Sequence, residues 1–344
     1  MTTGLIEIIK PGFANGIQDT GRYGYRHMGV AVSGFLDRLF ARCANALVGN
    51  TDDAACIEMR VTGPVLAVRR GPVRVALAGN VTATIRRATG AAEELSAWRS
   101  ATLGCSDVLE IGAVKGGTSY LAVSGGIAVT PQLGSRSTYQ RAKIGGIEGR
   151  LIAAGDVLPC AAASSDADEE RQAPPWRHAD SPIRVVLGPQ IDHFATEAVA
   201  TFMASEYQVT PQLDRMGMRL QGEKLAHVTS SAADIVSDGV TPGAIQVPGE
   251  GQPIILLADC QTVGGYPKIA TVICADRPRL GQLEPGQTVR FAATDVTQAR
   301  IALEEQERAW RTWASQIVFG GINFDAVYGD GSGCWKDDDD EILV

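Results

Sequence analysis

Apolar and polar positions alternate in short runs along most of the chain. The apolar runs are rich in Val, Ile, Leu and Ala and end at Gly, Pro, Asp or Asn, as in VRVALAG, SYLAVSGGI, IRVVLG and PIILLAD. Runs of this kind are typical of β-strands between tight turns. Because they follow one another without a regular alternation of strand and helix, they favour barrels over a doubly wound sheet. We therefore expect a mainly β protein with a few helices.

Three segments have helical spacing instead. Residues 33–50 place apolar side chains on one face, with Ser33 as the expected N-cap and Gly49 as the expected end of the helix. The other two predicted helices lie within residues 192–205 and 294–319.

A change of composition divides the chain near its middle. Residues 161–181 are polar, acidic and contain prolines, which is typical of a linker. The flanking halves, 1–160 and 182–293, both contain a buried strand that ends in Gly-Gly and, later, a glycine-containing turn into a closing strand. This echo predicts two β-barrel domains in tandem, followed by the helix of residues 294–319. We expect residues 320–344, an acidic tail of low complexity, to be disordered.

The composition of the chain limits the classes of partner that we expect it to bind. The chain of 344 residues is too long for one ordinary core, which agrees with two domains. A net charge of −8 and scattered Lys and Arg residues argue against a nucleic-acid partner. No apolar run reaches membrane-spanning length and the first residues do not form a signal peptide, so we expect a cytoplasmic protein without a membrane partner.

Cysteine and histidine spacing gives no metal signature. The seven cysteines include no CxxC pair, and the four histidines have no ligand spacing. We expect free thiols in a reducing compartment and no metal site.

The first polar cluster is NGIQDTGRYGYRHMG. It places Gln18, Asp19 and Arg22 among glycines, where a backbone can approach a ligand closely. Asp37 and Asn45 follow on the predicted helix, two turns apart and on roughly one face. An ion pair between Asp19 and Arg22 that only shapes the turn is an equally good interpretation.

The second cluster, LGSRSTY, surrounds Arg136 with hydroxyl groups and glycine. It is either an anion cradle or a capped surface turn. The pair Asp214-Arg215 precedes another glycine turn, and we interpret this pair as structural.

The third cluster follows the apolar run of residues 254–258. Its polar and glycine positions, which a strand would carry to a barrel rim, are Asp259, Gln261, Thr262, Gly264, Gly265, Tyr266 and Lys268. The glycines would offer N–H groups to an anion, and the lysine a fixed positive charge. Gln246 on a flanking strand would orient a planar substrate. A Gly-Gly turn followed by a lysine that reaches water explains the same residues structurally.

Taken in order, these motifs resemble one family, which covers about residues 5–292. It is the family of allophanate hydrolase subunit 2, also known as the family of the biotin-dependent carboxyltransferase or of the 5-oxoprolinase C subunit. The motifs that carry the resemblance are GIQDTGRYGYRHMGV, SGFLDRLFARCANALVGN, IEMRVTGP, SYLAVSGGI, LGSRSTY, IGGIEGRLIAAGDVL, DRMGMRL, GAIQVPGEGQPIILLADCQTVGGYPKIATVI and QLEPGQTVRF. The resemblance implies two cyclophilin-like β-barrel domains.

The resemblance also implies work within a hetero-oligomer. The function we favour is that of one component of an ATP-dependent 5-oxoprolinase, which opens a small cyclic amide. The alternatives are the carboxyltransferase component of a biotin-dependent urea or amide carboxylase (urea amidolyase type), and a non-catalytic regulator of a kinase inhibitor. The chain has no AMKM biotinylation segment and no ATP-binding glycine loop. We therefore expect no covalently bound cofactor, and ATP or carboxybiotin supplied through partner subunits.

The expected partners are a smaller B-type chain and either a third chain of lactam-utilisation type or a biotin carboxylase and carrier. Under the resemblance, Asp19, Arg22, Asp259 and Lys268 are the expected catalytic residues, with either aspartate as the base. The expected substrate-binding residues are Gln18, Asp37, Asn45, Arg136, Gln246, Gln261, Thr262, Gly264, Gly265 and Tyr266. All of them are expected to line one basin for a flat amide.

Overall fold

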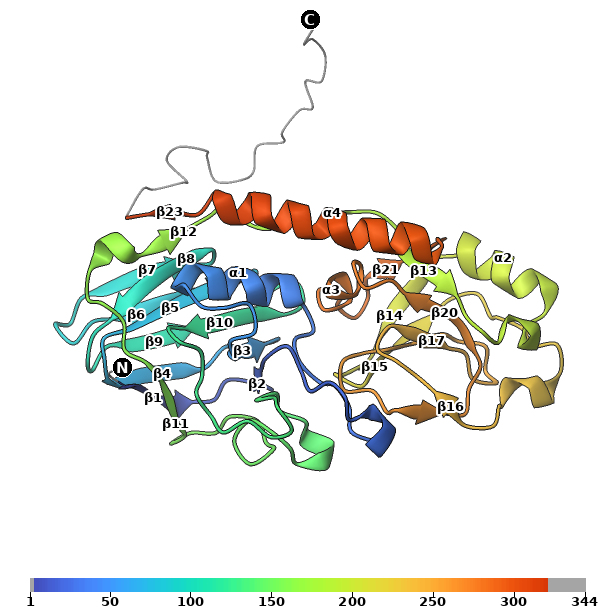
Figure 1. The fold of residues 1–344 in the computed structure, drawn as a ribbon, viewed down its shortest axis with the longest axis horizontal. Helices are drawn as coiled ribbons and strands as arrows, with labels where there is room; N and C mark the ends of the chain where they lie inside the picture. Colours follow the sequence, from blue (N-terminus) through green and yellow to red (C-terminus); the bar gives the residue numbers. More distant parts are fainter. Residues whose placement is uncertain (1–2, 321–344) are drawn as a thin grey trace, which may run out of the picture.

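The computed structural model describes residues 3–320, which form two barrel-like β domains lying side by side (Figure 1). The predicted fold class, mainly β with two barrel-like domains, is confirmed. Of the predicted tail, residues 320–344, all but Gly320 lie outside the described part. The α-helices are α1 (Arg38–Val48), α2 (Thr196–Ala204), α3 (Arg277–Leu280) and α4 (Val296–Ser315). Single turns of 3-10 helix are η1 (Arg26–Met28), η2 (Gln140–Ala142), η3 (Ala167–Glu169), η4 (Ile191–His193) and η5 (Ser230–Ala233).

The first domain consists of two antiparallel sheets. Their strand orders are β11-β1-β4-β9-β6-β7 and β2-β3-β10-β5-β8-β12-β23. The strand bounds are β1 (Thr3–Lys10), β2 (Gly16–Gln18), β3 (Cys56–Met59), β4 (Val65–Arg70), β5 (Val73–Ala78), β6 (Thr82–Arg86), β7 (Ala92–Ser96), β8 (Arg99–Leu103), β9 (Val108–Ile111), β10 (Ser119–Val123), β11 (Val157–Ala161), β12 (Arg171–Gln172) and β23 (Val318–Phe319).

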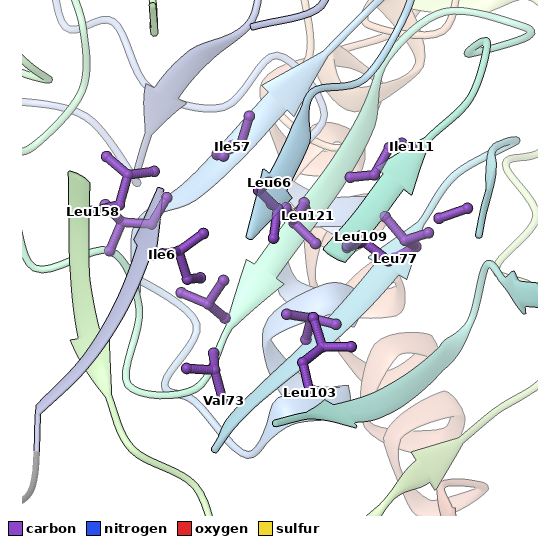
Figure 2. Packing of buried hydrophobic residues seen from close by; sticks show 14 of the residues in the cluster. Ile6, Ile57, Leu66, Val73, Leu77, Leu103, Leu109, Ile111, Leu121 and Leu158 are labelled. Carbon is purple, nitrogen blue, oxygen red and sulfur yellow. The ribbon is translucent and has the colours of Figure 1, made fainter. Parts of the chain in front are cut away.

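Aliphatic side chains from both sheets fill the space between them (Figure 2). Ile6 and Leu66 come from the six-stranded sheet, and Leu77 and Leu121 come from the seven-stranded sheet; each is at most 1% exposed. Burial of one such side chain contributes about 1.5–3 kcal/mol. The alternation seen in the sequence thus places one face of each strand in this core.

The second domain is built on one eight-stranded sheet. Its order is β21-β14-β15-β18-β17-β20-β13-β22, and only the β13–β22 pair among these strands is parallel. A separate two-stranded antiparallel sheet pairs β16 with β19. The strand bounds are β13 (Ile183–Leu187), β14 (Tyr207–Leu213), β15 (Gly217–Gln221), β16 (Asp238–Gly239), β17 (Ala244–Gln246), β18 (Ile254–Leu256), β19 (Val263–Gly264), β20 (Lys268–Val272), β21 (Thr288–Val289) and β22 (Phe291–Ala293).

The segment expected to be a linker, residues 161–181, also adds structure to the first domain. Its strand β12 pairs with β8 and with β23, which follows α4. Helix α4 runs along both domains (Figure 1), and Trp313 near its end donates a hydrogen bond to the Pro174 carbonyl at 2.7 Å. The chain therefore returns to its first domain after completing the second. Within residues 3–320, no helix has both the length and the apolar character needed to cross a membrane.

Helix α1 begins later than the sequence suggested. The N-cap is Asp37, whose carboxylate accepts hydrogen bonds from the N–H groups of Leu39 and Phe40 at 3.0 and 3.1 Å. The expected cap, Ser33, has a left-handed φ of 57° and its N–H binds the Ala258 carbonyl of the second domain at 3.0 Å. That contact between domains keeps Ser33 out of the helix, so the expectation for Ser33 was wrong.

The fully buried Asp37 also accepts hydrogen bonds from His178 at 2.6 Å and Gln282 at 2.7 Å. Asp37→Ala removes the cap and the acceptor of the half-buried His178 and Gln282 side chains, while Gln282 keeps its hydrogen bond to the Thr118 carbonyl. We expect it to lower the free energy of unfolding by about 2–4 kcal/mol, measured by urea denaturation. The matched control is Asp295→Ala, because Asp295 caps α4 through Gln298 alone; it should cost about 1 kcal/mol. Equal losses in the two variants would contradict the role given to the additional contacts.

Candidate functional site

An ionic network centred on Arg215 joins the two domains. Arg215 binds both carboxylate oxygens of Asp259, from Nε at 2.9 Å and from Nη2 at 3.0 Å. Its Nη1 pairs with Glu58 of the first domain, and its Nη2 also donates to the Gly34 carbonyl at 2.7 Å. Burial disfavours the charged guanidinium, but Asp259 and Glu58 outweigh burial and raise the pKa of Arg215. The guanidinium is therefore permanently charged and fixed between its two partners.

Glu58 is held from the other side as well. Its second oxygen accepts hydrogen bonds from the Tyr120 hydroxyl at 2.7 Å and from the Leu36 N–H at 2.9 Å. Burial, with help from the nearby carboxylates, raises the pKa of Tyr120 well above its usual value, so the phenol stays a donor. The same hydroxyl accepts from the Asp37 N–H at 2.8 Å. A continuous polar chain thus runs from the start of α1 to the second domain.

A cleft of about 440 Å³ opens beside this network; we call it the interdomain cleft. Glu58, Arg60 and Tyr139 line it from the first domain, and Arg215 and Asp259 from the second. Apolar side chains complete the wall, namely Phe13, Leu151, Leu213 and Met216. Charged groups on an apolar wall, in a space of this size, are typical of a site for a small polar molecule.

Tyr139 and Arg60 are two donors in the cleft that retain free hydrogen-bonding capacity, and Arg141 also lines it. The Tyr139 hydroxyl has no hydrogen-bond partner within residues 3–320, and burial raises its pKa, so it stays protonated. Arg60 donates only to the Leu283 carbonyl, at 3.2 Å. Burial lowers the pKa of Arg60 from a very high starting value, so its charge remains at neutral pH. Arg215, by contrast, already uses four of its five N–H groups on these partners.

Asp19, an expected catalytic residue, is the centre of a second network. Its Oδ1 accepts hydrogen bonds from the hydroxyls of Ser135 and Ser137, both at 2.6 Å, and from the Gly21 N–H at 2.9 Å. Its Oδ2 accepts from the Arg136 N–H at 2.5 Å. Four donors on one buried carboxylate fix the 135–137 loop against β2.

Arg22 lies beside that network and is 1% exposed. One of its N–H groups binds the Ser137 carbonyl, while Nε and Nη1 have no partner among the described residues. Burial lowers the pKa of Arg22, opposed by the charges of Asp19 and Asp259. The expected local ion pair between Asp19 and Arg22 is absent at hydrogen-bond distance in the described structure, and the two groups interact at longer range.

Lys268 connects the third cluster to strand β16. On β20 its Nζ binds the Asp238 carboxylate at 2.7 Å, and the residue is 5% exposed. Asp238 in turn pairs with Gly264 in the two-stranded β16–β19 sheet. A side chain at Gly264 would place its Cβ 2.6 Å from Nε2 of Gln246, which explains the glycine. Gln246 itself donates to the Tyr266 carbonyl at 3.3 Å.

The rest of the third cluster is connected through its backbone. The carbonyl groups of Gln261, Thr262 and Gly265 accept hydrogen bonds, respectively, from Arg26 at 3.1 Å, Val240 at 3.1 Å and Ile235 at 2.8 Å. These hydrogen bonds connect the loop after Asp259 to Arg26 and to the segment around β16.

Three further candidates make structural contacts away from the cleft. Asn45 is fully buried in α1 and donates to the Ala54 carbonyl at 2.9 Å. Gln18 donates to the Thr138 carbonyl at 3.1 Å. The Arg136 side chain donates to the Val129 carbonyl at 2.9 Å.

Of the expected site residues, Asp259 lines the interdomain cleft, whereas Arg22 and Lys268 do not. The sequence analysis overlooked Glu58, Arg60 and Tyr139, and it interpreted Arg215 as structural. A signal for the first two was present in CIEMRV. Residues two apart in a strand share a face, so Glu58 and Arg60 put two charges on one side of an otherwise apolar segment.

Comparison with known proteins places the chain in a family. Residues 28–293 match the family described as "Carboxyltransferase domain, subdomain A and B". The chain belongs to this carboxyltransferase domain family. The resemblance inferred from the sequence motifs is thereby confirmed.

Members of the carboxyltransferase domain family resemble the chain along most of its length. It is 35% identical over 333 residues to the 5-oxoprolinase C subunit of Escherichia coli, covering 89% of this chain and 98% of that protein. The crystal structure of TTHA0988 matches with a TM-score of 0.73 and 33% identity, over 84% of this chain but 56% of that one. The urea amidolyase structure from Kluyveromyces lactis matches with a TM-score of 0.80 and 28% identity, over 93% of this chain and 21% of that enzyme.

The Arg215 network gives a stability prediction. Arg215→Met leaves Glu58 and Asp259 buried without their cation, so we expect a loss of about 3–5 kcal/mol in the free energy of unfolding, measured by urea denaturation. The control is Arg219→Met, because Arg219 forms a half-exposed pair with Glu250; it should cost about 0–1 kcal/mol.

A triple variant separates pairing from packing. Glu58→Gln, Arg215→Met and Asp259→Asn together remove every charge of the network, so much of the stability lost in Arg215→Met should return. A triple variant as unstable as Arg215→Met would show that lost packing, and not an unpaired charge, causes the defect.

Proposed function

We propose that this chain is the C-type component of an ATP-dependent 5-oxoprolinase, which opens 5-oxoproline to glutamate together with partner subunits. The observation that carries the proposal is the similarity to the 5-oxoprolinase C subunit of E. coli, which extends over 98% of that protein. The match to urea amidolyase, in contrast, covers a 21% section of a much longer enzyme. The proposed partners are a smaller B-type chain and a chain of lactam-utilisation type, through which ATP is supplied.

The interdomain cleft supports this chemistry. Activation of an amide places negative charge on its oxygen, and donors aimed at that oxygen stabilise the transition state. We assign this role to the Tyr139 hydroxyl and to the N–H groups of Arg60 that do not bind the Leu283 carbonyl. Asp259 faces the same cleft with an orientation fixed by Arg215, and accepts the N–H of the amide in our proposal. Apolar wall residues reduce the water around these groups, which strengthens each interaction.

Arg22 and Lys268 remain part of the proposed machinery as positioning residues. Arg22 holds the loop of Ser137 from inside and lies within electrostatic range of Asp259. Through its ion pair with Asp238, Lys268 fixes the two-stranded β16–β19 sheet, which contains part of the loop after Asp259. Their effect on turnover would pass through the placement of Asp259.

Carboxyl transfer from carboxybiotin is the second candidate. It is favoured by the TM-score of 0.80 to the urea amidolyase structure over 93% of this chain. The two activities share an amide-like group whose oxygen gains charge, so the same cleft serves both. Carboxylation of urea by the chain with a biotin carboxylase, a biotin carrier and the smaller partner would select this alternative.

Reconstitution with the partner subunits tests the proposal. The complex should form glutamate from 5-oxoproline only with ATP and only when this chain is present. Tyr139→Phe and Arg60→Gln should each lower kcat about a hundredfold, because each removes one donor to the developing charge. Tyr25→Phe and Arg219→Gln are the matched controls and should leave turnover unchanged. If no glutamate forms with all partners present, the proposed function is wrong.

The positioning role has its own test in the same assay. Lys268→Met should lower kcat about tenfold with little change in KM, because a displaced catalytic group slows the reaction more than it weakens binding. Lys268→Arg keeps the charge opposite Asp238 and should retain most of the turnover. Arg22→Met should behave like Lys268→Met. Turnover within a fewfold of wild type in both methionine variants would remove Arg22 and Lys268 from the mechanism.

A further inference from the structure

A second pocket lies at the same domain boundary and shares no lining residue with the interdomain cleft. Its volume is about 180 Å³, below the range of about 300–1,000 Å³ typical of drug-sized ligands. Buried apolar residues form much of its wall, among them Leu36, Leu257, Ala258 and Leu280. The space therefore suits a small molecule with an apolar body.

Two guanidinium groups line this pocket without a carboxylate partner. Within residues 3–320, neither Arg38 nor Arg277 has an acidic side chain at salt-bridge distance. Arg38 donates from Nη2 to Gln306 of α4 at 3.0 Å, and its buried Nε has no partner. Arg277 donates to the Cys274 sulfur at 2.9 Å. Arg42, one turn further along α1, is by contrast paired with acidic side chains.

Arg38 and Arg277 also interact electrostatically. Burial, followed by the positive charge of Arg277, lowers the pKa of Arg38. An anion between them would relieve this repulsion and occupy the free donors.

Ser33 supplies an independent sign of a ligand. It lines the pocket and is only 5% exposed, yet its hydroxyl has no hydrogen-bond partner among the described residues. A buried hydroxyl without a partner is costly, and an oxygen of a bound molecule would satisfy it. Its left-handed φ of 57° is a conformation that serine rarely adopts.

We propose that this pocket binds a small monocarboxylate with an apolar body, the carboxylate lying between Arg38 and Arg277 and the body lying on the wall of Leu36 and Leu257. The Ser33 hydroxyl donates to the ligand. This binding does not depend on the proposed oxoprolinase function, and it is a property of the chain without its partners.

Calorimetric titration of the full chain with three probes tests the binding. Cyclopentanecarboxylate carries both recognition elements, cyclopentanecarboxamide lacks the charge, and inorganic phosphate lacks the apolar body. Cyclopentanecarboxylate should bind, and Arg38→Gln or Arg277→Gln should each weaken its binding about tenfold or more, because a charge-assisted hydrogen bond is lost. Arg219→Gln should leave it unchanged, and the carboxamide should not bind.

Cys274 gives a second measurement, independent of folding defects in the variants. This exposed thiol lines the pocket, whereas Cys105 is exposed outside it. Cyclopentanecarboxylate should slow the alkylation of Cys274 by iodoacetamide, followed by peptide mass spectrometry, and leave Cys105 unaffected. The proposal is overturned if the carboxylate does not bind, if the carboxamide binds equally well, if phosphate displaces the carboxylate at lower concentration, or if Arg277→Gln leaves the affinity within twofold.

Discussion

The structure depends on one cation that satisfies two carboxylates from different domains. Glu58 and Asp259 would repel each other and would each be costly to bury, and Arg215 removes both difficulties at once. Because the second domain contributes both Arg215 and Asp259 while the first contributes Glu58 alone, the buried Glu58 finds its cation only across the domain boundary. Docking of the domains is therefore part of folding. The same network forms a wall of the interdomain cleft, so the groups on that wall are held in place before any ligand binds.

Close backbone contacts reinforce this boundary. The Thr118 hydroxyl donates to the Gly281 carbonyl at 2.8 Å. A Cβ at Gly117 would lie 2.4 Å from Cα of Gln282, so only glycine permits the approach. Helix α4 adds a further connection, because Gln306 donates to the Ala275 carbonyl of the second domain while accepting from Arg38 of the first. A hinge motion of the domains would break all these contacts together. The cleft is thus largely pre-formed.

The sequence predicted what depends on local pattern and missed what depends on distant partners. Alternating apolar residues identified the strands of both cores, and helical spacing identified α1, α2 and α4. The start of α1 was misplaced because Ser33 and Asp37 are both good caps, and the choice is made by the Ala258 carbonyl of the other domain. The sequence identified Lys268 as a candidate for the site. Its partner Asp238, on β16, is brought to it only by the tertiary structure.

Arg215 shows most clearly what a local sequence pattern does not predict. An Asp-Arg pair before a glycine turn is common, and nothing in the neighbouring residues distinguishes this one. Its partners Asp259 and Glu58 are 44 and 157 positions away in the sequence. Only the folded chain brings them together, whereas a pattern of short range identifies the segments and not their meeting point.

The chain segment of residues 256–259 separates the two spaces at the domain boundary. Leu257 and Ala258 face the second pocket, and the next residue, Asp259, faces the interdomain cleft. This segment is fixed on both sides, by the Ser33 N–H on the Ala258 carbonyl and by Arg215 on the Asp259 carboxylate. A ligand in one space influences affinity in the other only if the wall has a second arrangement that the ligand prefers. In the described structure Arg215 and Ser33 hold this wall in one arrangement, so a coupling between the proposed ligand site and the interdomain cleft would require a second arrangement of residues 256–259.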